Sequence, residues 1–261
     1  MRWGVVVAAG GYADPELASA IGTSRKALAS FGGRTSLEFT LSAVAAAGFD
    51  ECVTVGGDEI RPFVAHGEFA MEGETAVDNV LIGVRVLGDV DALLLLPSDS
   101  PLMTGEMLGH FVESVSLRIQ VEAQPQYFGN RWFSAGLARA TDFASAYPGI
   151  DMRPIKLKGC KFVSGALYAT TSEGLQAAVE TFRQARRGRK SQFKLVSQFG
   201  FGNVIRYFLG SVSLPVAERI LTRGLGGATA LITDCHPATC LDFDTAEEFA
   251  YVQRLMENRG A

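Results

Sequence analysis

Two short runs of unbroken apolar residues limit most strongly what this chain can fold into. The first, residues 4–8, is rich in β-branched valine, and the second, residues 92–96, ends at Pro97. Each is predicted to be a buried strand, because neither run has a polar face to turn toward water. Strands of this kind are typical of a parallel sheet that is covered by helices on both faces.

The residues between and after these runs carry the spacing of amphipathic helices. A helix is predicted around Leu37, Leu41 and Val44, with Thr35 or Ser36 as its N-cap and Gly48 as its stop. Residues 51–55 read as a strand, and 104–115 as a further helix. Another apolar helical stripe is formed by Val77, Val80, Leu81, Val84 and Leu87. This alternation predicts an α/β fold with a mostly parallel central sheet and helices on both faces.

The second half of the chain is less regular but continues the same fold. We predict a helix near 137–147, a strand over 162–168 and a helix over 172–187. Glycines at 200, 202 and 210 break residues 189–224 into short helical pieces, which suggests a small helical insertion. Strands are predicted over 228–233 and 239–243, with a final helix over 245–258. No repeat or linker divides the chain, so 1–261 is interpreted as a single domain.

Composition excludes several classes of protein. Apolar residues make up 48% of the chain, too many for disorder, and the net charge of −4 argues against a nucleic-acid partner. No apolar run reaches the roughly 18 residues of a membrane span, so no membrane partner is expected. The four cysteines form no CxxC pair and no export signal precedes them, which favours reduced thiols and a cytoplasmic protein. The Cys235, His236 and Cys240 group is interpreted as structural rather than as a metal site.

The turn after the first strand is a candidate phosphate-binding segment. It contains Ala8, Ala9, Gly10 and Gly11, and open parallel sheets bind ligands beyond the carboxyl ends of their strands. Glycine there lets backbone amides approach a phosphate, although many α/β proteins carry such a turn without a ligand. Downstream, Lys26 is either a contact for triphosphate oxygens or an ordinary surface lysine.

Two aspartates are candidate ligands for a divalent cation. Asp99 follows the 92–96 strand at its carboxyl end, and Asp244 lies before the final helix, two residues after Asp242. Carboxylates suit a hard cation that neutralises phosphate oxygens. The alternatives are a turn aspartate at 99 and a helix N-cap at 244. The basic residues between 183 and 194 are either a solvated helix face or phosphate contacts, and the three histidines suggest no catalytic triad.

In order and spacing, these elements resemble the nucleotidyltransferases of the nucleotide-diphospho-sugar transferase superfamily, and within it the MobA-like NTP transferase family. The segments that carry the resemblance are the turn at 9–11, KAL at 26–28, GGRTSL at 32–37, AGFDECVTVG at 47–56, Asp78-Asn79, SDSPLMT at 98–104 and LDFDTAEE at 241–248. The family's GxGxRMG loop is absent, and a longer connection runs from Gly11 to Ser24. Arg25 is the candidate substitute for the arginine of that loop.

The resemblance implies a GT-A-like, Rossmann-like fold and an enzyme that transfers a nucleoside monophosphate from a nucleoside triphosphate to a small phosphorylated acceptor, releasing pyrophosphate. It implies phosphate contacts from residues 8–11 and Lys26, a base or sugar contact from Asn79, magnesium held by Asp99 and Asp244, and Lys26 and Asp99 as catalytic residues. The acceptor site would come from 124–225, with 189–224 acting as a lid or as a homodimer contact. The alternatives are a metal-dependent glycosyltransferase and a nucleotide-binding protein without turnover.

Overall fold

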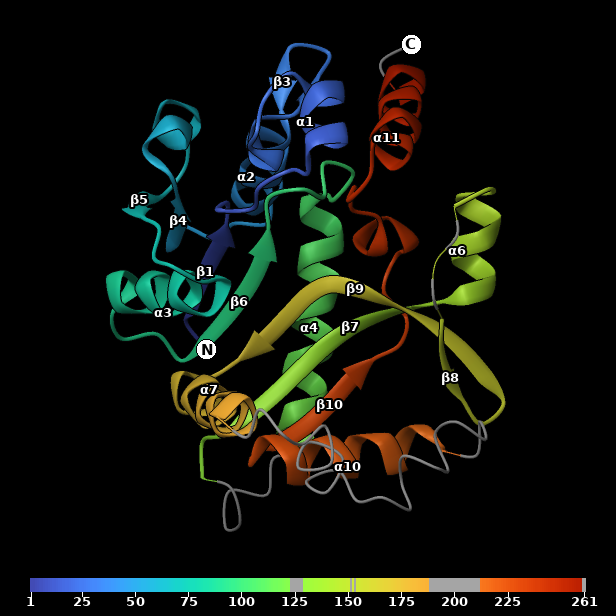
Figure 1. The fold of residues 1–261 in the computed structure, drawn as a ribbon. Coiled ribbons are helices and arrows are strands. Elements are labelled where there is room, and N and C mark those ends of the chain that lie inside the picture. Colours follow the sequence, from blue (N-terminus) through green and yellow to red (C-terminus); the bar gives the residue numbers. More distant parts are fainter. Residues whose placement is uncertain (123–128, 151, 153, 188–211, 260–261) are drawn as a thin grey trace.

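The computed structural model describes residues 1–122, 129–150, 152, 154–187 and 212–259. Their centre is an eight-stranded sheet of order β10-β7-β9-β6-β1-β4-β5, with β8 paired to β9 (Figure 1). β9 runs antiparallel to β6 and β7, and the other pairs along this order are parallel. The strands are β1 (Trp3–Ala8), β4 (Cys52–Gly56), β5 (Glu68–Met71), β6 (Ala92–Pro97), β7 (Trp132–Arg139), β8 (Ile155–Leu157), β9 (Cys160–Thr170) and β10 (Ala228–Ile232). The predicted mostly parallel α/β sheet is confirmed.

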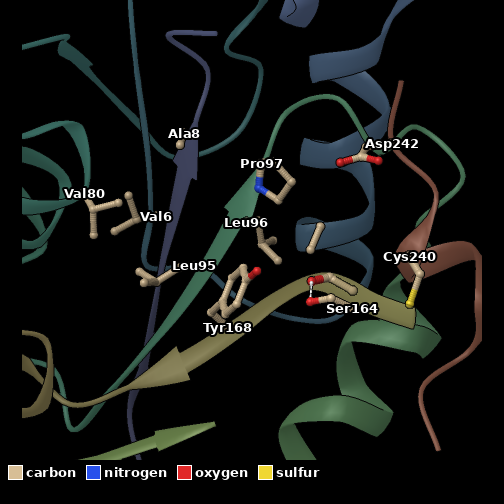
Figure 2. Close-up of a pocket in the computed structure, with 12 residues that line it drawn as sticks. Val6, Ala8, Val80, Leu95, Leu96, Pro97, Ser164, Tyr168, Cys240 and Asp242 are labelled. Carbon is tan, nitrogen blue, oxygen red and sulfur yellow. Dashed lines mark hydrogen bonds between the residues drawn. The ribbon is translucent and has the colours of Figure 1, made fainter. Parts of the chain in front are cut away.

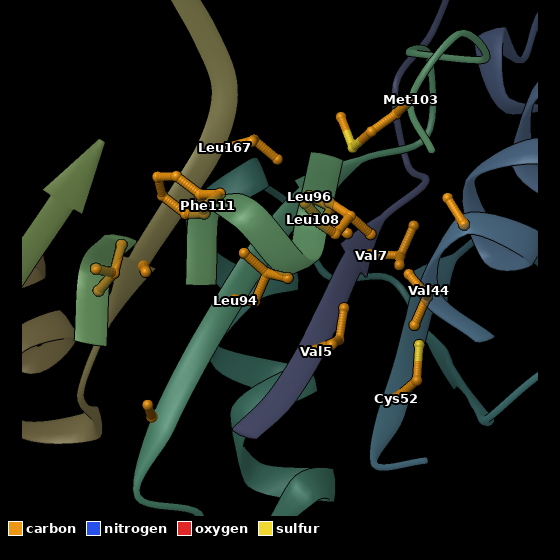
Figure 3. Close-up of a cluster of buried hydrophobic side chains, with 14 of the residues drawn as sticks. Val5, Val7, Val44, Cys52, Leu94, Leu96, Met103, Leu108, Phe111 and Leu167 are labelled. Carbon is orange, nitrogen blue, oxygen red and sulfur yellow. The ribbon is translucent and has the colours of Figure 1, made fainter. Parts of the chain in front are cut away.

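Helices cover both faces of this sheet. The longer ones are α2 (Ser36–Ala46), α3 (Ala76–Leu87), α4 (Gly105–Glu122), α7 (Ser172–Arg187), α10 (Leu214–Leu225) and α11 (Ala246–Arg259). Side chains of β1 alternate between the two faces. Val5 and Val7 join the core beneath α2 and α4 (Figure 3). Val6 points to the other face and packs toward α3. Burial on both faces explains why β1 is apolar throughout.

A second hydrophobic cluster lies beyond the carboxyl ends of the strands. It joins α1 (Pro15–Ile21), the short hairpin β2 (Ser30–Phe31) and β3 (Arg34–Thr35), α6 (Ala140–Ala146), η3 (Pro237–Cys240) and α11. Phe31, Phe243 and Phe249 form its aromatic centre, with ring centroids 5.2–5.7 Å apart. We call this group the cap cluster, since α1, β3 and α11 lie above the ends of β1 and β6 in the view of Figure 1.

Two predicted elements differ from the structure. Residues 137–147 were expected to be helical, but β7 continues to Arg139 before α6 begins, because β9 pairs with β7 along its length. Residues 239–243 were expected to form a strand, but η3 replaces its start. Local bonds favour that turn: the Ala238 amide donates to His236 Nδ1 and the Thr239 hydroxyl donates to the His236 carbonyl.

The predicted insertion at 189–224 falls mainly on 188–211, outside the described residues. Its last part is α10, a continuous helix that packs on β10 and α7. The lid and homodimer interpretations of this segment therefore stay predictions. No helix in the described ranges is long and apolar enough to cross a bilayer.

Candidate active site

The turn after β1 presents backbone amides at the edge of the sheet. Ala9 is buried, and its amide donates to the Val55 carbonyl at 2.8 Å, so it anchors the turn to β4. Within the described chain, no hydrogen bond engages the amides of Gly10 and Gly11. These two amides are available to an anion, whereas the amide of Ala9 is not.

Residues 12–25 form a long excursion that leaves this turn and comes back to it, so that Lys26 lies next to Gly11. The excursion holds α1, which Asp14 caps, Pro15 starts and Gly22 ends at a φ of 73°. It closes where the Lys26 amide donates to the Gly11 carbonyl at 3.2 Å. Lys26 begins the short 3-10 helix η1 (Lys26–Leu28). Ala27 fills the core under the sheet and Ala29 the cap cluster, so the backbone beside Lys26 is fixed on both sides.

Lys26 joins the two predicted metal ligands. Its Nζ lies 3.6 Å from Asp99 Oδ2 and contacts Asp244 Oδ1 directly. The lysine side chain is only 14% exposed, which excludes an ordinary surface lysine. Burial lowers the pKa of Lys26, but the bond to Asp244 and the charges of Asp99 and Asp244 outweigh it and raise this pKa. Lys26 is therefore a cation in this site.

Asp244 is free for this contact because another residue caps the helix. The Thr245 hydroxyl accepts the Glu248 amide at 3.2 Å, and Glu248 in turn accepts the amides of Asp244 and Thr245. This reciprocal capping box starts α11. The N-cap interpretation of Asp244 is therefore wrong, and its carboxylate points to Lys26.

Asp99 and Asp242 occupy environments that oppose negative charge. Burial raises the pKa of Asp99, against the charge of Lys26. Burial and the charges of Asp99 and Asp244 raise the pKa of Asp242 to about 6. One oxygen of Asp99, Oδ1, is buried and has no hydrogen-bond partner within the described chain. A further cation beside these carboxylates would relieve both effects.

A pocket of about 450 Å³ adjoins these carboxylates (Figure 2). Its floor comes from β1 and β6, with Ala8 and Pro97 at the strand ends, and its far wall from β9. Its polar groups are Ser164, Tyr168 and Asp242. Tyr168 is 47% exposed although it lies in the middle of the sheet. The sequence motifs did not indicate this wall, because no short pattern marks which face of β9 remains open.

Asn79 lies beside the glycine turn but is already engaged. It is buried in the first half of α3, and its Oδ1 accepts the Gly73 amide at 2.7 Å. A Cβ on Gly10 would lie 2.5 Å from Asn79 Nδ2 and 2.5 Å from Glu72 Oε2. A side chain at position 10 would therefore require the ends of Asn79 and Glu72 to move.

Arg25 is not an exposed cation that could contact phosphate, which was its suggested role. It is 3% exposed and pairs with Glu59, from η2 (Asp58–Phe63), and with Glu72, which follows β5. Sequence reasoning missed both acids, because they lie 34 and 47 residues away along the chain. Only the folded sheet brings the ends of β4 and β5 to Arg25.

Cys235 and Cys240, on either side of His236, make local contacts. Cys235 and Cys240 are buried, burial raises the pKa of both thiols, and they donate to the carbonyls of Ile232 and Val163. In the residues that the structure describes, no group of three or more His, Cys, Asp or Glu side chains is arranged to hold a metal ion. The interpretation of these cysteines as structural stays a prediction.

Several solved structures share this fold. A hypothetical transferase from Thermus thermophilus superimposes with a TM-score of 0.78 and 21% identity, over 95% of this chain and 100% of that one. A 2-C-methyl-D-erythritol 4-phosphate cytidylyltransferase, also from Thermus thermophilus, gives 0.55 and 17%, over 98% and 100%. CMP:2-keto-3-deoxy-manno-octonic acid synthetase, complexed with CTP, gives 0.58 and 14%, over 99% and 100%. Identities this low show the shared fold alone.

Family membership comes from a match to a protein-family model rather than from these structures. No curated protein matches the chain. The model of the MobA-like NTP transferase domain matches residues 4–191, which include the glycine turn, Lys26, Asn79 and Asp99. Because this match spans well over half of the sequence, the chain belongs to the MobA-like NTP transferase family and is a nucleotidyltransferase.

Proposed function

We propose that this enzyme transfers a nucleoside monophosphate from a nucleoside triphosphate to a small phosphorylated acceptor. An acceptor phosphate oxygen attacks the α-phosphorus, the bond from that phosphorus to the bridging oxygen breaks, and pyrophosphate leaves. Chemistry of this type depends on positioning and charge stabilisation rather than on a nucleophilic side chain. The proposed reaction therefore needs no catalytic triad, and the sequence predicts none.

The observation that carries this proposal is the convergence of Lys26, Asp99 and Asp244 beside two unengaged backbone amides. The Gly10 and Gly11 amides and the Lys26 ammonium provide three positive groups for a polyphosphate. In this reaction Lys26 offsets the charge that builds on the bridging and leaving oxygens. Asn79, next to Gly10, then lies on the nucleoside side of the turn.

The carboxylates fit a magnesium ion. The unpartnered buried oxygen of Asp99 and the raised pKa of Asp242 both indicate that Lys26 alone does not balance the negative charge of these carboxylates. Magnesium is typically held by one or two carboxylates, with waters and phosphate oxygens completing its shell. Asp99 and Asp244 would hold the ion. When bound there, it would neutralise phosphate charge.

The pocket wall from β9 is the candidate acceptor subsite. It lies next to Asp242, on the far side of the β6 end from the glycine turn (Figure 2). Ser164 and Tyr168 offer hydroxyl groups for an acceptor, and Gly165 and Ala166 keep the wall open. These residues fall within 124–225, the part of the chain from which the acceptor site is expected.

The test is a thermal-shift screen of ATP, CTP, GTP and UTP with and without magnesium, followed by a pyrophosphate-release assay with sugar-phosphate acceptors. A ligand that binds only the folded protein raises its melting temperature. We expect one triphosphate to stabilise the protein more strongly with magnesium. We also expect Asp99→Asn to lower turnover by about 10²–10³-fold, as for a lost electrostatic contact.

The competing functions give different results in the same assays. Release of a nucleoside diphosphate from a nucleotide sugar would favour a glycosyltransferase. Triphosphate binding without pyrophosphate release, across a panel of acceptors, would favour a binding protein. No stabilisation by any of the four triphosphates would contradict the proposal itself.

A further inference from the structure

Arg25 is a buried cation that is shared between two carboxylates and the glycine turn. Its Nη1 donates to Glu72 Oε2 at 2.9 Å and to the Gly10 carbonyl at 3.1 Å, and its Nη2 donates to Glu72 Oε1 at 2.5 Å. Its Nε donates to Glu59, and its guanidinium lies 3.7 Å from the ring centroid of Tyr12. Burial lowers the pKa of Arg25, but Glu72 and Glu59 outweigh it and raise this pKa.

Arg25 and Tyr12 lie where the two ends of the long excursion after β1 meet. Tyr12 and Arg25 form an isolated antiparallel bridge, and the Ala13 amide donates to the Ser24 carbonyl at 2.9 Å. Arg25 is directly followed by Lys26. The guanidinium therefore ties the start of η1 to the glycine turn and to the ends of β4 and β5. A bidentate arginine pair holds such a junction with more directional precision than a lysine would.

The charge of Arg25 matters for anion binding because Glu72 lies beside the glycine turn. Its Oε2 lies 2.5 Å from the place of a Cβ on Gly10, so the carboxylate touches the turn whose amides are free. An uncompensated carboxylate there would repel a polyphosphate, and the repulsion would grow with each phosphate. Glu72 is 19% exposed and Arg25 is 4% exposed at the side chain, so solvent screens the pair only in part.

We propose that Arg25 is a positioning residue for nucleotide binding, which neutralises Glu72 beside Gly10 and holds the glycine turn and Lys26 in place for a triphosphate. The inference rests on the proposed function. In this role Arg25 contacts no phosphate itself, because its side chain is buried and four of its five N–H donors bond to Glu59, Glu72 and the Gly10 carbonyl. The role of Arg25 is therefore indirect, whereas a substitute for the arginine of the GxGxRMG loop would contact phosphate directly.

The test compares Arg25→Met, Glu72→Gln and the double variant Arg25→Met/Glu72→Gln. Calorimetry measures binding of ATP, CTP, GTP and UTP and of the matching monophosphates, at low and high salt. Arg25→Met is expected to weaken binding of the preferred triphosphate by about 10–100-fold, as for the loss of a bond to a charged group. The monophosphate loses less, and added salt reduces the difference because it screens the repulsion from Glu72.

The double variant separates charge from packing. Glu72→Gln removes the repelling charge, so it is expected to restore much of the triphosphate affinity that Arg25→Met loses. Arg61→Met is the matched control, since Arg61 lies in the same η2 element as Glu59 but is exposed and pairs with Asp58. It is expected to bind triphosphate as the wild type does.

Several outcomes would overturn the inference. One is a folded Arg25→Met protein that binds triphosphate like the wild type. Another is an equal loss for triphosphate and monophosphate that neither salt nor Glu72→Gln changes, which indicates a merely structural residue. If Arg25→Met does not fold, Arg25→Lys decides: it keeps the charge and is expected to keep the triphosphate preference, and losing that preference contradicts the inference. A wild-type protein that binds none of the four triphosphates overturns the proposed function, and this inference with it.

Discussion

At the scale of single residues, the site brings one ammonium group between carboxylates that come from distant parts of the chain. Lys26 follows the excursion after β1, Asp99 follows β6 and Asp244 precedes α11. In the free protein the Lys26 ammonium therefore lies next to the two carboxylates that would hold the proposed magnesium ion. A magnesium ion bound there would compete with Lys26 for the same carboxylates, and a bound triphosphate would give Lys26 another partner.

The first prediction follows from this competition. Lys26→Met is expected to bind Mn²⁺ about tenfold more tightly than the wild type when no nucleotide is present, since a charge-assisted contact no longer opposes it. The same variant is expected to lose triphosphate affinity more than monophosphate affinity. Electron paramagnetic resonance of Mn²⁺ gives the first quantity, and calorimetry gives the second.

Lys156→Met is the control for the change in charge, because Lys156 is exposed on β8. It should leave Mn²⁺ binding as in the wild type. Mn²⁺ affinity that is unchanged or lower in Lys26→Met would show that Lys26 and the metal do not share Asp99 and Asp244.

At the scale of elements, close contact between α3 and the sheet determines where Asn79 lies. Gly83 faces β1, and a Cβ at this position would lie 2.5 Å from Val6 Cγ1 and 2.9 Å from Val6 Cγ2. Val6 is buried and cannot swing away. The helix approaches the strand this closely only because position 83 has no side chain.

Gly83→Ala is therefore expected to destabilise the protein by about 1–3 kcal/mol through overpacking. This is the opposite of the gain of about 1 kcal/mol that alanine gives over glycine inside a helix. Gly109→Ala in α4 is the matched control, because a Cβ there meets nothing within 4 Å, and it should be stabilising. Chemical denaturation of both variants measures the effect, and equal changes in both would refute the packing argument.

The start of α2 predicts a pH dependence of stability. Thr35 and Glu38 form a capping box, in which the bonds from the Thr35 amide and hydroxyl lower the pKa of Glu38. A carboxyl whose pKa is lowered by folding contributes stability above its ordinary pKa, and this contribution is lost as pH falls through the folded value. Glu38→Gln is thus expected to cost about 0.5–1 kcal/mol at neutral pH and progressively less below the ordinary pKa of glutamate.

The same chain offers an internal control for this cap. In a Thr35→Ala background the hydroxyl bond to Glu38 is lost, whereas the backbone amide of residue 35 still donates to it. Glu38→Gln should then cost less than in the wild-type background, and the remaining cost should still fall as the pH is lowered. Urea denaturation from acidic to neutral pH tests both statements. A cost of Glu38→Gln that is constant across this range would contradict the assigned role of the carboxylate.

Local signals explain which elements could be predicted from the sequence. β1, β4, β6, α2 and α3 were predicted because each carries its own apolar run, stripe or cap. β7 was missed because its long pairing with β9 decides its conformation. Asp99 and Asp244 could be selected as strand-end and helix-start carboxylates, but their meeting at Lys26 depends on the packing of the sheet. The pairing of Arg25 with Glu59 and Glu72 left no local signal at all.

At the scale of the whole molecule, the site lies at the boundary between two hydrophobic clusters. Asp99 extends from β6 of the central sheet, whereas Asp244 follows Phe243 of the cap cluster. Lys26 lies between them, with Ala27 in one cluster and Ala29 in the other. The distance between the two carboxylates therefore depends on how the cap cluster sits on the sheet.

The last prediction uses two phenylalanines of the cap cluster that differ in their distance from Asp244 along the chain. Phe243 is fully buried against Phe31 and Phe249, and Phe143 is 2% exposed and packs on Tyr147. Phe243→Leu and Phe143→Leu should each cost about 1–2 kcal/mol of stability, from lost contacts in a close-packed region. Only Phe243→Leu should also weaken magnesium-dependent triphosphate binding several-fold, because the backbone that carries Asp244 settles into the vacated space. Calorimetry at a temperature where both variants are folded measures this, and equal weakening in both would mean that the cap cluster acts on the site only through global stability.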